Sequence, residues 1–199
     1  MEFLFTYEQY LAATEEYNRY VFPFQVILLI GAIVATALVF TKIKNKSAAV
    51  GIILGTSWLW SGIFFHILYL SSLTLAGYFT GGIVILQGIF LFYEALFRNS
   101  HLEFKYERSG QHIAGFILVV TGLIIYPLIG VFDNREISKA IVFGLPCTTT
   151  IATFGFFMMT GKKFPLYLLV IPSLWAMIGF LISLHILMYE DILLLAAAI

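Results

Sequence analysis

The chain has 199 residues, of which 61% are hydrophobic and 11% are charged, and its formal net charge is zero. Soluble domains carry about 25% charged residues, so this composition leaves too little polar surface to cover a water-soluble globule. It predicts a membrane protein whose main partner is the lipid bilayer. The balanced charge excludes the broad basic surface that attracts nucleic acid, so no nucleic-acid partner is expected. A single cysteine, Cys147, excludes an internal disulfide and a CxxC motif.

Residues 1–20 are too polar to cross a bilayer, because they carry four glutamates. Thr6 followed by Gln9 matches a capping box, which marks the start of a helix. The charged residues and the tyrosines of this stretch fall largely on different helical faces. This pattern is typical of a helix that lies in the membrane interface, so we predict a short N-terminal interfacial helix over residues 1–20.

Apolar runs long enough to cross a membrane cover much of the remaining chain. They are residues 21–41, 48–73, 76–97, 112–131, 140–160 and 164–188. Backbone groups in lipid must bond within their own segment, so these runs predict an all-α polytopic bundle of about six transmembrane helices within residues 21–191. Residues 192–199 are apolar but too short to span. They are expected to form either an interfacial tail or the stub of a seventh helix.

Basic residues are unevenly distributed among the predicted loops, and this distribution indicates the orientation. Eight of the eleven fall on one side: Lys42, Lys44, Lys46, Arg98, Lys105, Arg108, Lys162 and Lys163. Arg19, Arg135 and Lys139 fall on the other side, together with most of the acidic residues, including Glu190 and Asp191. The positive-inside rule therefore predicts that the eight face the cytoplasm and that both termini lie outside.

Two histidines fall inside predicted spans, where ionisable groups are costly and are candidates for function. His66 shares a helical face with Gly51, Gly55 and Tyr69, so this face should meet another helix. At about 1.5 Å per residue, His185 in the last span lies at a similar depth. Two histidines at one level could bind a haem iron or a metal ion. The alternative is that each bonds a neighbouring helix or interfacial water.

The segment from Pro146 to Thr150 is the least ordinary part of the chain. Proline frees a backbone carbonyl, and Thr148, Thr149 and Thr150 can satisfy such groups or offer hydroxyls to a ligand. Internal prolines in the spans on either side suggest kinks around a shared cavity, or they merely shape the packing. The sequence thus predicts a polar site in the outer half of the bundle. Its candidate ligand-binding residues are His66, Tyr69, Cys147, Thr148, Thr149, Thr150 and His185.

One carboxyl group, that of Glu94, lies near the cytoplasmic end of the third predicted span. Arg98 follows four residues later on the same helical face, so an intrahelical ion pair explains Glu94 without any function. The alternative is a proton-coupling carboxylate, with Gln87 two turns deeper on the same helix.

Several short motifs resemble an uncharacterised bacterial family of small multi-pass membrane proteins, a domain of unknown function. They are the WLWSG segment at 58–62 with His66, the YPL segment at 126–128, the PCTTT segment at 146–150 and the IPSLW segment at 171–175. The resemblance implies one domain in a bacterial membrane, so the plasma (inner) membrane is the expected location. It implies no established activity and no catalytic residues.

Three functions remain open from the sequence. The internal prolines, the threonine run and the polar residues at one depth favour a small transporter or permeation protein. The scarcity of ionisable residues favours an accessory subunit of a larger membrane complex, or a homo-oligomer. His66 and His185 favour a haem- or metal-binding redox protein, in which the metal ligands would be these two residues. An enzyme is not favoured, because no nucleophile and base pair is visible.

Overall fold

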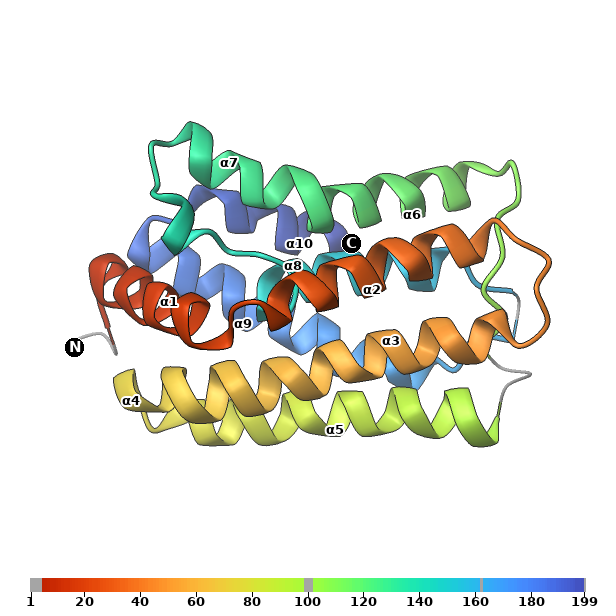
Figure 1. Cartoon of the computed structure of the whole chain (residues 1–199), viewed down its shortest axis with the longest axis horizontal. Coiled ribbons are helices and arrows are strands. Elements are labelled where there is room, and N and C mark those ends of the chain that lie inside the picture. The colour runs from red at the N-terminus through yellow and green to blue at the C-terminus, as the bar shows by residue number, and fades with distance from the viewer. Residues whose placement is uncertain (1–4, 99–101, 162, 199) are drawn as a thin grey trace.

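The computed structural model describes residues 5–98, 102–161 and 163–198, which form helices joined by short connections (Figure 1). Residues 1–4 of the predicted interfacial helix, Lys162 of the basic loops and Ile199 of the tail lie outside these ranges. Within the described ranges the only β-structure is a pair of isolated bridges. The predicted all-α class is therefore confirmed.

A sharp elbow separates the first two helices, α1 (Tyr7–Val21) and α2 (Phe24–Val39), whose axes differ by 85°. The predicted capping box opens α1, because the Gln9 backbone N–H donates to Thr6 Oγ1 over 3.2 Å and the Thr6 N–H donates to Gln9 Oε1 over 2.9 Å. Figure 1 places α1 at one end of the bundle, while α2 runs along it.

The helical segments 46–73 and 76–97 pack against each other through small residues. The helix α3 (Lys46–Trp60) continues through a π-helical segment (Ser61–Leu70) into α4 (Ser71–Leu73), and α5 (Ala76–Phe97) lies beside it. A Cβ added at Gly62 would come within 3.0 Å of the Gly81 carbonyl oxygen. The small-residue faces of these helices therefore serve packing within one chain.

The remaining helices begin with α6 (Gly110–Val120), which passes through a π-helical segment (Thr121–Ile125) into α7 (Tyr126–Phe132). Pro127 has no N–H to complete the regular ladder, which accounts for the irregular turn just before it. The last elements are α8 (Pro146–Met158), α9 (Val170–Ile186) with a preceding 3₁₀ turn (Leu166–Leu169), and α10 (Ile192–Ala198) after another 3₁₀ turn (Tyr189–Asp191).

Four helices are long and apolar enough to cross a membrane, and a bent pair made of α1 and α2 would give a fifth. The four are Lys46–Leu73, Ala76–Phe97, Gly110–Phe132 and Leu166–Ile186. The sequence predicted about six membrane-spanning helices, and the described residues contain fewer helices of that length.

The continuous helix expected over residues 140–160 is wrong in its first part. Residues 140–145 are non-helical, Gly144 has a φ of 103°, and α8 begins only at Pro146. The physical reason is that a residue before proline is driven out of the helical region, and Leu145 accordingly has a ψ of 152°. From residue 146 to residue 157 every side chain of α8 is buried, so this short helix lies in the middle of the bundle.

The C-terminal segment forms the short helix α10, one face of which packs against the bundle, and the expected interfacial tail stays a prediction. After α9 the chain reverses, and α10 packs against both α9 and α8. Leu194 and Ala197 are buried, and a Cβ added at Gly179 of α9 would come within 2.7 Å of the Leu194 side chain. The segment therefore covers α8, because burying its apolar side chains there is more favourable than exposing them.

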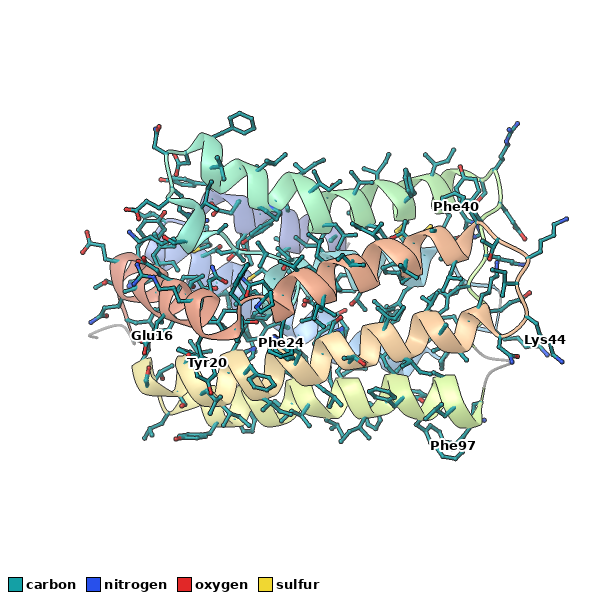
Figure 2. The ribbon with its side chains drawn as sticks, in the orientation of Figure 1. Glu16, Tyr20, Phe24, Phe40, Lys44 and Phe97 are labelled. Carbon is teal, nitrogen blue, oxygen red and sulfur yellow. The ribbon has the colours of Figure 1, made fainter. Side chains whose placement is uncertain are left out.

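The connections that carry most basic residues gather at one end of the bundle. Figure 1 shows that α2–α3, α5–α6 and α8–α9 are all joined at this end, opposite α1. Figure 2 shows Lys44 projecting from it, while Glu16 projects from the other end.

Candidate functional site

A group of buried polar side chains surrounds the carboxyl group of Asp191, close to the start of α8. The hydroxyl of Tyr126 on α7 donates a hydrogen bond to Asp191 Oδ1, and the thiol of Cys147 on α8 donates to the same carboxyl group. Tyr10 of α1 faces the same group, and Asp191 is only 4% exposed. We call Tyr10, Tyr126, Cys147 and Asp191 the Asp191 cluster.

The reversal of the chain after α9 places Asp191 inside the bundle. Leu187 ends α9 in the left-handed conformation, with a φ of 60°, and the Met188 N–H donates to the Ser183 carbonyl over 3.0 Å. The following 3₁₀ turn then directs Asp191 toward the first turn of α8. Because Pro146 fixes the start of α8, the turn and the helix meet at Cys147.

A buried ion pair lies next to the cluster. The guanidinium of Arg135, in the connection between α7 and α8, donates to Glu190 Oε1, and both side chains are almost completely buried. Arg135 also donates to the Tyr7 hydroxyl over 3.2 Å. Tyr126 lies six residues before Phe132, the last residue of α7. At about 1.5 Å per residue, the cluster therefore lies about 9 Å inside the bundle from that end of α7. The ion pair thus joins three segments at this end of the bundle.

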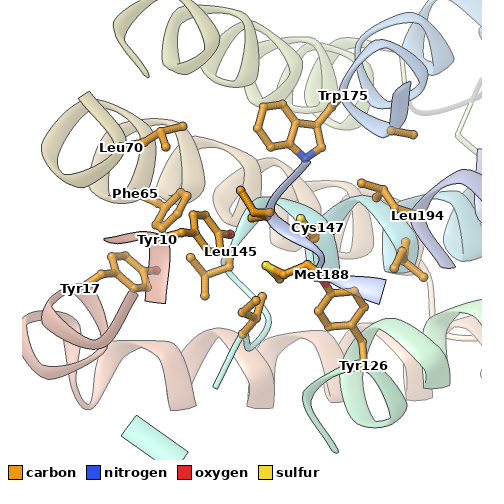
Figure 3. Packing of buried hydrophobic residues seen from close by; sticks show 14 of the residues in the cluster. Tyr10, Tyr17, Phe65, Leu70, Tyr126, Leu145, Cys147, Trp175, Met188 and Leu194 are labelled. Carbon is orange, nitrogen blue, oxygen red and sulfur yellow. The ribbon is translucent and has the colours of Figure 1, made fainter. Parts of the chain in front are cut away.

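A small cavity of about 30 Å³ adjoins the cluster. Its lining includes Tyr10, Phe65, Cys147, Trp175 and Asp191. In Figure 3 the indole nitrogen of Trp175 points toward Cys147 and Met188. Trp175 Nε1 has no hydrogen-bond partner among the described protein atoms, although its side chain is buried. A cavity of this size has room for at least one water molecule, which can accept from the indole N–H.

The environment of Asp191 changes its acidity. Burial raises the pKa of this carboxyl from 3.8 to about 6, against the opposing effect of the hydrogen bonds from Tyr126 and Cys147. The negative charge of Glu190 raises this pKa further, whereas Arg135 lowers it. Desolvation dominates because the ionised form loses more hydration than two donors restore. Asp191 therefore exchanges its proton at a pH close to neutral.

The structure does not bring the two predicted metal-binding histidines together. His66 is buried, its Nδ1 lies 2.9 Å from Thr80 Oγ1, and its ring contacts Trp175 at 4.8 Å between centroids. His185 is exposed, and it lies ten residues beyond Trp175, or about 15 Å farther along α9. The described residues contain no group of three His, Cys, Asp or Glu side chains placed to hold a metal ion. The haem or metal site stays a prediction.

The other predicted ligand residues have varied surroundings. Tyr69 packs against Tyr17 of α1, with 5.7 Å between ring centroids. Thr148 Oγ1 donates to the Val142 carbonyl over 2.8 Å, and Thr149 Oγ1 accepts from the Gly144 N–H over 3.1 Å. These two hydroxyls therefore hold the non-helical segment before α8, as threonine side chains do when they compete with regular backbone bonds.

Two further polar side chains complete this part of the bundle. Thr150 is buried, and its hydroxyl has no partner among the described protein atoms. It is thus the member of the threonine run whose hydroxyl is left for a ligand or water. Asn18 of α1 supports the same non-helical segment, because its Nδ2 donates to the Ser138 and Ala140 carbonyls over 2.8 and 2.9 Å.

The predicted proton-coupling carboxylate, Glu94, is buried at the basic end of the bundle. Its Oε1 accepts a hydrogen bond from the Tyr167 hydroxyl over 2.6 Å. Tyr167 lies in the 3₁₀ turn that precedes α9, so this contact joins α5 to the start of the last long helix. Glu94 and the Asp191 cluster therefore lie at opposite ends of the bundle (Figure 1).

The sequence interpretation missed the central residues of the cluster. It assigned Glu190 and Asp191 to an outer loop and gave no role to Tyr10 or Tyr126. One signal was present: the two acids directly precede the apolar run 192–198. A helix that returns into the bundle would draw such acids inside with it. The partners of Asp191 come from distant parts of the chain, so no local sequence pattern predicts these contacts.

The architecture defines an all-helical protein with four helices long and apolar enough to cross a membrane. The chain belongs to the DUF6064 family, a family of unknown function, which matches residues 7–199. Membership of an uncharacterised family is therefore confirmed. No curated protein and no solved structure matches the chain.

Proposed function

We propose that this protein is an integral membrane protein that lets a small ion or solute pass, with the Asp191 cluster as its outer binding site. The observation that carries the proposal is the interrupted segment 140–160, in which a non-helical stretch leads into a short helix buried on all sides. Non-helical backbone at membrane depth is tolerated where it is enclosed by protein or lines a hydrated cavity. Transporters commonly place their binding sites at such broken helices.

Polar side chains recur between the two ends of the bundle, and they support a path from the Asp191 cluster toward Glu94. Trp58 Nε1 donates to Thr153 Oγ1 over 2.9 Å in the interior of the bundle. Gln87 Nε2 donates to the Leu168 carbonyl over 3.0 Å, and Gln87 Oε1 has no partner among the described atoms. Buried polar atoms without protein partners favour bound water. Water at these points would connect the two buried carboxyl groups.

The proposed membrane arrangement has six crossings. Five are the four long helices and α2, the arm of the bent pair that runs along the bundle, and the sixth is the interrupted segment 140–160. Large apolar side chains exposed around the bundle, such as Ile27, Ile30 and Ile117, would face lipid. The basic end would face the cytoplasm by the positive-inside rule, in a bacterial plasma membrane, with α1 in the outer interface.

The orientation can be tested by labelling single cysteines in intact cells. In a Cys147→Ser background, we expect Asp133→Cys to react with a membrane-impermeant maleimide from outside and Lys44→Cys to react only after the membrane is opened. Both positions are exposed, at opposite ends of the bundle, so each serves as the control for the other. Labelling of Lys44→Cys from outside would reverse the proposed orientation.

The transport function can be tested with purified protein in liposomes, using gradients of H⁺, Na⁺, K⁺ and NH₄⁺. We expect flux of at least one of these ions above that of protein-free vesicles. Asp191→Asn should lower this flux toward the protein-free rate, because it replaces the carboxyl at the centre of the site by a neutral group of nearly the same size.

The matched control is Asp133→Asn, which makes the same replacement at an exposed aspartate outside the Asp191 cluster. This variant should conduct as the unmodified protein does. The proposal fails if no ion moves faster than in protein-free vesicles, or if Asp191→Asn conducts as well as Asp133→Asn.

A further inference from the structure

We infer that the ion handled at the Asp191 cluster is a proton, which the Asp191 carboxyl takes up and releases through water in the adjoining cavity. The inference rests on the proposed function and names its substrate. It is carried by three observations: the types of group around the carboxyl, the size of the cavity, and the unpartnered indole N–H of Trp175.

The groups around Asp191 suit a proton better than a metal cation. Hard cations take about six or more oxygen ligands, whereas the cluster offers one carboxylate. Tyr126 and Cys147 direct hydrogen-bond donors at that carboxylate, and the indole N–H of Trp175 can only donate. The two donors on this carboxylate stabilise its negative form after the proton leaves, and together with the indole N–H they leave little room for a second positive ion.

The cavity is large enough to hold water. Its volume of about 30 Å³ exceeds the roughly 10–15 Å³ that one water molecule needs. Trp175 and Asp191 both line it, so one water can accept from the indole N–H and donate to the carboxylate. Such a water is the acceptor that a leaving proton needs. The buried Trp175 N–H, which otherwise has no partner among the described atoms, gains its missing bond in the same step.

Among the titratable groups that surround Asp191, its own carboxyl is the one that changes protonation state. The neighbouring groups are Tyr10 on α1, Tyr126 on α7, Cys147 on α8, and the pair formed by Glu190 and Arg135. Arg135 and Glu190 neutralise each other, and the remaining three are neutral at physiological pH. Burial raises the pKa of Asp191 to about 6, so its proton is available within the physiological range.

The test combines infrared titration with proton flux in the same liposomes. We expect a protonated-carboxyl band that titrates near pH 6, that is lost in Asp191→Asn and that is kept in Asp133→Asn. Asparagine can still accept the bonds from Tyr126 and Cys147, so this variant should fold. Asp133 is an exposed aspartate, which makes its variant the matched control. Proton flux should fall to the protein-free rate in Asp191→Asn only.

A second variant keeps the inference testable if Asp191→Asn does not fold. Tyr126→Phe removes a hydrogen bond that stabilises the carboxylate, so the titration midpoint should move to higher pH. A flux of Na⁺, K⁺ or NH₄⁺ without a titrating band overturns the inference and leaves the proposed function standing. A band that titrates without flux of any ion overturns the proposed function and supports proton exchange at Asp191.

Discussion

Glu190→Ala is expected to lower the free energy of unfolding by about 3–5 kcal/mol, which is the usual cost of breaking a buried ion pair from one side. The Arg135 guanidinium stays in the bundle in this variant with its main anionic partner removed. Its remaining hydrogen bond, to the Tyr7 hydroxyl at 3.2 Å, cannot replace a carboxylate. The measurement is equilibrium unfolding of the purified protein in mixed micelles with increasing denaturing detergent.

Two comparisons distinguish this effect from a general loss of charge. Glu136 lies in the same connection but is exposed and paired with Lys139, so Glu136→Ala should cost no more than about 1 kcal/mol. Replacing Arg135 and Glu190 together by methionine removes both buried charges, and the double variant should unfold at least as late as the unmodified protein. If Glu190→Ala costs no more than Glu136→Ala, the ion pair is not buried as described.

Gly155→Val is expected to lower the free energy of unfolding by about 3 kcal/mol, the upper part of the range for overpacked interiors. A Cβ at Gly155 of α8 would lie 2.5 Å from the Gly115 carbonyl oxygen and 2.7 Å from the Val119 nitrogen of α6. Both atoms belong to the backbone of α6, so they cannot move away from the added side chain unless the two helices separate. Thermal unfolding followed by circular dichroism would measure the change.

Gly82→Val provides the control, because an added Cβ at Gly82 meets nothing within 4 Å and the residue lies in the middle of α5. Its effect should stay within about 0.5 kcal/mol. If both variants lost the same free energy of unfolding, valine would act through its low helix propensity and not through a steric clash between helices. A loss confined to Gly155→Val would also carry a functional consequence, since α8 positions Cys147.

The long apolar helices could be predicted from the sequence because their signal is local. Residues 76–97 form one apolar run with polar residues at both ends, and α5 occupies the same residues. The run 48–73 likewise lies within the continuous helix Lys46–Leu73. Hydrophobic length is sufficient in such cases, because a bilayer requires every backbone group to bond within its own helix. The capping box at Thr6 is equally local.

The interior of the bundle could not be predicted in the same way. Pro146 reads from the sequence as an internal kink, and only the structure shows it as the first residue of α8. The reversal that buries Asp191 depends on Leu187, which adopts the left-handed conformation. Glycine or asparagine usually occupies such a position, so the leucine gives no sign of a helix end in the sequence. The partners of Asp191 are 181, 65 and 44 residues away, at Tyr10, Tyr126 and Cys147. Such contacts follow from packing, not from spacing.

The place of α10 has a consequence for the order in which the protein assembles. Residues 192–198 cover one side of α8, and α8 has no side of its own that faces outward. A chain leaves the ribosome N-terminus first, so α8 is synthesised before the segment that completes its surroundings. Its final packing, and with it the burial of Asp191, must therefore wait until residues 192–198 have been synthesised.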